Sequence, residues 1–134
     1  MEESVTEVTK SSTGLESNVA GLLCYLLGWV SGLIFFLIEK DSKKVKFHAM
    51  QSILLFGGIT VLFVILSVLQ GILWSLAWHG GGGALLAISG LFGIISTILW
   101  IASLILWILL MVKAYQNEAF KLPVIGNIAE KQLQ

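Results

Sequence analysis

The amino-acid sequence predicts an all-α integral membrane protein, and two observations carry this prediction. Hydrophobic residues make up 57% of the chain and charged residues only 12%, a composition outside the range of soluble domains. The stretch from Phe47 to Val112 contains no Lys, Arg, Asp or Glu. Because so long an apolar stretch cannot fold as a water-soluble domain, it is expected to lie in lipid.

The apolar residues divide into three expected transmembrane helices. Residues 18–38 supply about 20 apolar positions, the length needed to cross a bilayer, and Glu39, Lys40 and Asp41 close this first span. The charge-free stretch is roughly three times that length, and the four glycines at 80–83 are its strongest helix breaker. We therefore expect long second and third helices over 47–79 and 84–112, forming a hairpin around the glycine turn.

The first segment leaves an alternative open. Gly28 and Gly32 enclose a short stretch in which a helix could break. A break there would turn the segment into a hairpin, give four membrane segments instead of three, and place the N-terminus inside.

The chain is expected to form one membrane domain with two short flanking segments. Residues 1–17 are acidic and rich in Ser and Thr, so we expect a disordered tail. The transmembrane domain covers 18–116. Residues 117–134 contain an apolar patch too short to cross, which is expected to lie along the cytoplasmic interface.

Lysine positions predict the orientation. With three crossings, two groups of lysines fall on one face, which the positive-inside rule assigns to the cytoplasm. We expect a multi-pass protein of the cell (inner or plasma) membrane with its N-terminus outside and its C-terminus cytoplasmic. The two groups are Lys40, Lys43, Lys44 and Lys46, and Lys113, Lys121 and Lys131.

Several function classes are disfavoured. The formal net charge is zero and all eight basic residues are lysines, so nucleic acid is not an expected partner. Cys24 is the only cysteine, and its apolar surroundings indicate a buried hydrophobe. Metal, nucleotide and redox motifs are absent, and no carboxylate lies inside a span. We therefore expect no enzyme, no metal and no cofactor.

Small residues indicate where helices pack closely. Close backbone approach drives helix association in lipid. The expected packing positions serve either one chain or the contact between copies; they are Gly21, Gly28 and Gly32 in the first segment and Gly90 and Gly93 in the third.

One polar constellation stands at the start of the second span, and it is the candidate site. His48, Gln51 and Ser52 share a helix face. They could bind a lipid headgroup, a proton or a partner, or they could cap the helix and hydrogen-bond a neighbouring helix. The candidate set is Phe47, His48, Ala49, Gln51 and Ser52, with Lys43, Lys44 and Lys46 before it.

Several stretches of the chain resemble a family of small prokaryotic membrane proteins of unknown function. These stretches are Asn18–Ala20, Tyr25–Gly28, Glu39–Asp41, Phe47–Ser52, Lys113–Gln116 and Lys121–Gly126. The family is similar to the channel-like Tic subunit of the chloroplast inner-envelope import machinery and includes MamF-like magnetosome membrane proteins. The resemblance implies a multi-pass helical protein and brings no catalytic residues.

These observations favour a non-enzymatic, oligomeric membrane module, or a component of a transport or translocation assembly. Its expected partners are membrane lipids and further copies of itself or other membrane subunits. A stand-alone channel or small-solute transporter is the first alternative, and a lipid-modifying enzyme that uses His48 is the second.

Overall fold

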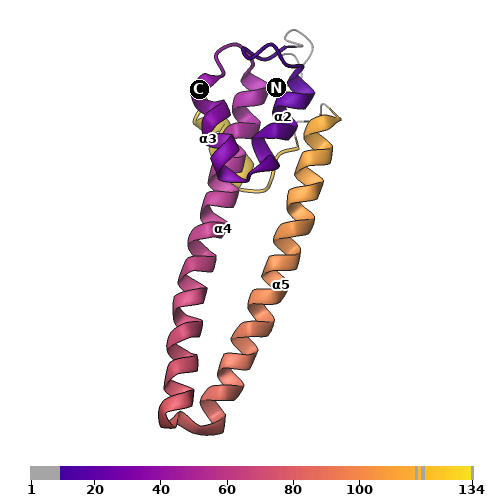
Figure 1. Cartoon of the computed structure of the whole chain (residues 1–134). Coiled ribbons are helices and arrows are strands. Elements are labelled where there is room, and N and C mark those ends of the chain that lie inside the picture. The colour runs from indigo at the N-terminus through magenta and orange to yellow at the C-terminus, as the bar shows by residue number, and fades with distance from the viewer. Residues whose placement is uncertain (1–9, 117, 119, 134) are drawn as a thin grey trace. The chain divides into compact units, whose positions relative to one another are not determined.

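The computed structural model describes residues 10–116, 118 and 120–133, and the regular elements in this part of the chain are helices. Figure 1 shows their arrangement along the chain. In order, the elements are α2 (Ser17–Leu26), α3 (Trp29–Ile38), α4 (Lys43–Leu76), η1 (Ala77–Gly81), α5 (Gly82–Tyr115) and α6 (Ile125–Lys131).

The chain divides into two compact units, and the long helices α4 and α5 contribute to both. The first unit contains the chain up to Gly58 together with the part from Leu106 onward, and the second contains Ile59–Ile105.

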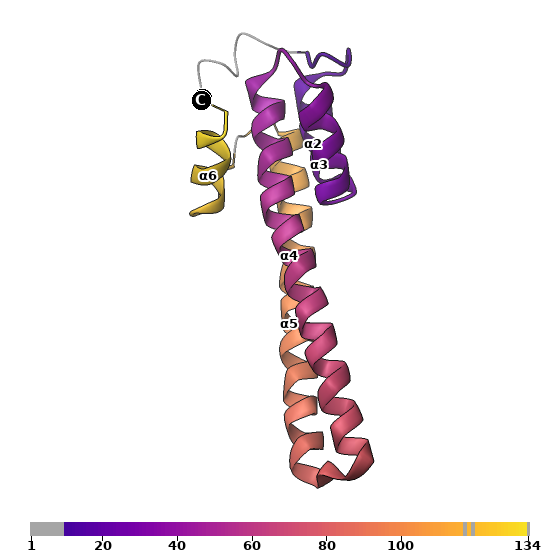
Figure 2. The ribbon, with the colours of Figure 1, turned by 90° about the vertical axis from the view of Figure 1, so that its left-hand side faces the viewer.

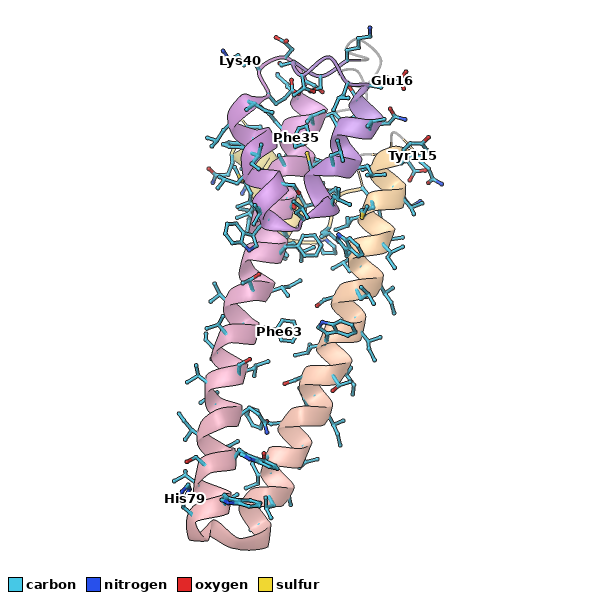
Figure 3. The ribbon with its side chains drawn as sticks, in the orientation of Figure 1. Glu16, Phe35, Lys40, Phe63, His79 and Tyr115 are labelled. Carbon is cyan, nitrogen blue, oxygen red and sulfur yellow. The ribbon has the colours of Figure 1, made fainter. Side chains whose placement is uncertain are left out.

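The second unit is an apolar helical hairpin. Helices α4 and α5 are long and apolar enough to cross a membrane, which confirms the two long apolar helices expected from the sequence. At the turn, Gly80 and Gly82 have φ of 129° and 71°, a backbone region that favours glycine. Gln70 Nε2 donates a hydrogen bond to Ser89 Oγ at 2.6 Å. Figure 3 shows Phe63 pointing from α4 toward the facing limb of α5.

The first apolar segment differs from the single span expected over residues 18–38. It is broken into α2 and α3, each of 10 residues. Gly28 lies at the break with φ of 63°, which interrupts the helical backbone. The two helices pack against each other as a hairpin, so the sequence alternative with a broken first segment describes this part of the fold.

The α2–α3 hairpin packs against the first turns of α4 (Figure 2). A Cβ added at Gly32 would lie 2.9 Å from the backbone oxygen of Ala49 and 2.9 Å from Ser52 Cβ. A Cβ at Gly21 would lie 3.1 Å from the ring of His48. Glycine therefore sets the closeness of these helices, as close backbone packing in lipid requires.

The segment that precedes α2 is tied to the far end of α3. Ser11 Oγ donates a hydrogen bond to the buried carboxylate of Glu39, and the Ser12 backbone N–H donates another at 3.0 Å. Residues 1–9 of the predicted disordered tail lie outside the described residues. In the rest of that tail, the contacts of Ser11 and Ser12 hold the chain at the polar end of the hairpin.

These contacts predict an acid-sensitive hairpin. Burial alone raises the pKa of the Glu39 carboxyl, but hydrogen bonds from Ser11, Ser42 and Ser12 outweigh it and lower the pKa from 4.5 to about 2. The ionised carboxylate therefore contributes stability that is complete above pH 4.5 and is lost as the pH falls toward 2. We expect near-ultraviolet circular dichroism of the detergent-solubilised protein to change across that window.

Two substitutions test the assignment of this transition. Glu39→Gln is expected to be less stable at neutral pH and to lose the pH dependence within the window, because its amide does not titrate. Glu16→Gln, at an exposed position just before α2, is expected to keep the transition. An unchanged acid transition in Glu39→Gln would assign it to another group.

Candidate functional site

Gln51 lies at the centre of a buried polar cluster in the first unit. Its side chain is fully buried, and all of its hydrogen bonds reach segments outside α4. The amide Nε2 donates to Tyr25 Oη at 3.0 Å and to the backbone oxygen of Phe120 at 2.9 Å. The Oε1 atom accepts from the Leu122 backbone N–H at 3.1 Å. One side chain therefore connects α4, α2 and the C-terminal segment.

Tyr25 links Gln51 to His48. Tyr25 Oη and His48 Nδ1 are 2.9 Å apart. Tyr25 Oη thus accepts a hydrogen bond from Gln51 and shares a second with His48, whose direction is set by the imidazole tautomer. Within the described part of the chain, His48 Nε2 is buried without a hydrogen-bond partner. His48 is 1% exposed, so its ring does not face solvent.

The other residues of the candidate stretch pack around this cluster. Phe47 is buried and meets the His48 ring edge-on, with 5.7 Å between the ring centroids. Ala49 is buried and its carbonyl faces Gly32. Ser52 Oγ donates to the backbone oxygen of Gly28 at 2.8 Å. The structure therefore brings these residues together with His48 and Gln51 at one helix contact.

The three candidate lysines before this cluster differ in exposure and surroundings. Lys43 is exposed, whereas Lys44 is only 2% exposed. Lys46 Nζ lies 5.9 Å from the centre of the Phe36 ring.

The family is decided by comparison of the whole chain. The magnetosome magnetite crystal formation protein family matches residues 12–129. The chain belongs to this family.

Relatives in this family are described as membrane proteins. A UPF0132 membrane protein of Methanocaldococcus jannaschii is 46% identical over 93% of this chain and 96% of its own length. A UPF0132 membrane protein of Archaeoglobus fulgidus is 44% identical over 89% of this chain and 97% of its own length. No solved structure matches the chain. The protein is thus a membrane protein of the magnetosome magnetite crystal formation family, as the MamF-like resemblance predicted.

Two stretches that lie far apart in the sequence meet at Gln51. Gln51 comes from the first stretch, and Leu122 and Gly126 come from the second. A Cβ at Gly126 would lie 3.0 Å from Gln51 Oε1, so glycine allows α6 to sit close to the amide. The two stretches are the two sides of one contact.

Sequence reasoning missed Tyr25, Phe120 and Leu122 as members of the cluster. Tyr25 and Leu122 stood within stretches that carry the resemblance, and the joint occurrence of those stretches was the available signal. Phe120 contributes a backbone oxygen to the cluster. Because every residue type has a backbone oxygen, the sequence gives no signal for such a contact.

The cluster is a connected set of buried polar side chains. It contains amide, phenol, imidazole and hydroxyl groups, and none of its members is a carboxylate. Among the described residues, no group of three or more His, Cys, Asp or Glu side chains could hold a metal ion. Buried polar groups connected in this way hold helices in one arrangement.

Proposed function

We propose that this protein is a non-enzymatic membrane module that self-associates through the α5 face bearing Gly90 and Gly93. Such a module would act as a structural part of a transport or translocation assembly in the cell membrane. A β-carbon added at either glycine meets nothing within 4 Å, so this smooth backbone face makes no close contact with the described part of the chain. That observation carries the proposal, because close backbone approach is the main route to helix association in lipid.

The contrast with the first segment supports the same reading. Gly21 packs closely against His48, and Gly32 packs closely against Ala49 and Ser52, within one chain. Gly90 and Gly93 have no such neighbours. The two sets of glycines therefore divide into internal contacts and a free face.

The burial of His48 favours a structural role over a catalytic one. Its Nδ1 faces Tyr25 Oη, and Gly21 covers its ring. A lipid-modifying reaction would require a substrate to reach this imidazole, so the enzymatic alternative ranks below the module.

The test is a pair of substitutions that do not disturb the fold of one chain. Gly90→Leu with Gly93→Leu places bulk into open space, so each chain should still fold. Overpacking of a close contact costs about 1–3 kcal/mol, which weakens association at least about fivefold. We expect native mass spectrometry in mild detergent to show a homo-oligomer for the parent and a shift toward monomer for the double variant.

Gly71→Leu is the matched control, because an added Cβ there also meets nothing within 4 Å, but Gly71 has no second glycine one helical turn away with which to form a smooth face. It should keep the parent oligomer. A parent that is monomeric and partner-free in native membranes would refute the module. Solute flux in liposomes that contain only this protein would instead favour the stand-alone channel.

A further inference from the structure

The α2–α3 hairpin is too short for either helix to cross a bilayer. Each helix has 10 residues, which corresponds to about 15 Å of length. The hydrocarbon core is about 30 Å thick. Each arm therefore reaches only about halfway through a membrane.

The outward side chains of the hairpin are apolar up to its tip. Leu27, at the turn, is 66% exposed, and Leu37 on α3 is 70% exposed. Leu33 and Ile34 are also exposed. A contiguous apolar surface of this kind on an isolated protein marks contact with lipid or another apolar partner.

The backbone of the turn is satisfied first by a side chain of the hairpin itself. Ser31 Oγ accepts a hydrogen bond from the Leu27 backbone N–H at 3.1 Å. The same hydroxyl donates to the backbone oxygen of Cys24 at 3.1 Å. Ser31 thus forms hydrogen bonds with one backbone N–H and one backbone carbonyl that the break in the helix would otherwise leave unpaired.

Two further carbonyls of the turn are bonded by side chains from α4 and α5. Ser52 Oγ donates to the Gly28 oxygen at 2.8 Å, and Trp107 Nε1 donates to the Tyr25 oxygen at 2.6 Å. Irregular backbone survives at membrane depth only when the protein itself satisfies its polar groups. These partners meet that condition for the Gly28 and Tyr25 carbonyls, so the turn is able to lie away from water.

The opposite end of the hairpin is polar. Glu39 is bonded there by Ser11 and Ser12, and the Ser12 hydroxyl accepts from the backbone N–H of Lys40 at 2.8 Å. Figure 3 shows Glu16 and Lys40 at this same end. The chain thus begins and ends the hairpin in one polar region, with the apolar tip at the other end.

We propose that α2–α3 is a re-entrant hairpin, which enters the acyl-chain region of the bilayer and returns to the face it came from. Lipid acyl chains contact the outer face of the hairpin, because its exposed side chains are apolar and the turn carries its own hydrogen-bond partners. The segment before α2, the lysine-rich loop after α3 and, after the two crossings by α4 and α5, the C-terminus then lie on one face. This topology replaces the outside N-terminus expected from three crossings.

Single-cysteine variants in a Cys24→Ala background test the proposal in native membrane vesicles of both orientations. Glu16→Cys, Leu27→Cys and Lys40→Cys all replace exposed side chains, so the fold should tolerate them. A membrane-impermeant maleimide should label positions 16 and 40 from the same face, and His79→Cys from the opposite face. Leu27→Cys should be labelled from neither face until the protein is denatured in SDS.

A nitroxide attached at Leu27→Cys gives a second readout in reconstituted liposomes. It should collide with dissolved oxygen and be protected from a water-soluble nickel chelate. Labelling of positions 16 and 40 from opposite faces would overturn the proposal in favour of a single crossing. Labelling of position 27 from either face, or free access of the nickel chelate, would also overturn it by placing the tip in water.

Discussion

Replacing Gln51 with alanine is expected to release the C-terminal segment from α4 and to destabilise the first unit. The substitution removes the Gln51 partner of the Phe120 oxygen and of the Leu122 N–H, and it leaves Tyr25 Oη with His48 alone of its two partners. A buried polar group left unpaired costs about 1–3 kcal/mol, so the loss from the Phe120 oxygen and the Leu122 N–H should reach about 2 kcal/mol or more. We expect a lower thermal midpoint in mild detergent and rapid tryptic cleavage after Lys121.

Gln116→Ala is the matched control for this experiment. Gln116 is exposed at the end of α5, so the same chemical change there should leave both the midpoint and the cleavage rate unchanged. Equal behaviour of the two variants would show that the Gln51 cluster does not hold the C-terminal segment.

Gly32→Ala is expected to push α3 away from α4. The new Cβ would lie 2.9 Å from the Ala49 oxygen, and because that oxygen belongs to the backbone it cannot rotate aside. Overpacking of this kind costs about 1–3 kcal/mol. The displacement should also break the hydrogen bond from Ser52 to the Gly28 oxygen. Thermal denaturation and hydrogen exchange of the α3 amides would both report the change.

The same substitution at Gly58 should raise the stability instead of lowering it. Gly58 lies in α4, and an added Cβ meets nothing within 4 Å. Alanine there lowers the backbone entropy lost on folding and should stabilise the helix by about 0.5–1 kcal/mol. If Gly32→Ala were as stabilising as Gly58→Ala, the close contact between α3 and α4 would be refuted.

Membrane class and the long helical hairpin could be predicted from the sequence because both depend on local properties. A charge-free run has only lipid in which to lie, and four consecutive glycines cannot remain helical without help. In the structure, Gly80 and Gly82 have positive φ and interrupt the helical backbone at the turn.

The broken first segment could only be raised as an alternative. An apolar stretch over residues 18–38 suits one spanning helix or two short ones equally well, because hydropathy does not record a change of direction. What decides between them is the left-handed backbone of Gly28 and the partners that Ser31, Ser52 and Trp107 give to the turn. Two of those partners come from other helices.

The polar residues of the candidate stretch could be picked out in the sequence, but the residues that they contact could not. Gln51 meets Phe120 and Leu122, which lie about seventy positions further along the chain. No periodicity connects residues at that separation.

By itself, the sequence determined that this is a helical membrane protein with two long apolar helices around a glycine turn, since hydrophobicity and backbone entropy are properties of consecutive residues. Only the tertiary structure decided that the first segment folds back on itself and that Gln51 joins it to the C-terminal segment. Those outcomes depend on hydrogen bonds and close contacts between residues that meet only after the chain has folded.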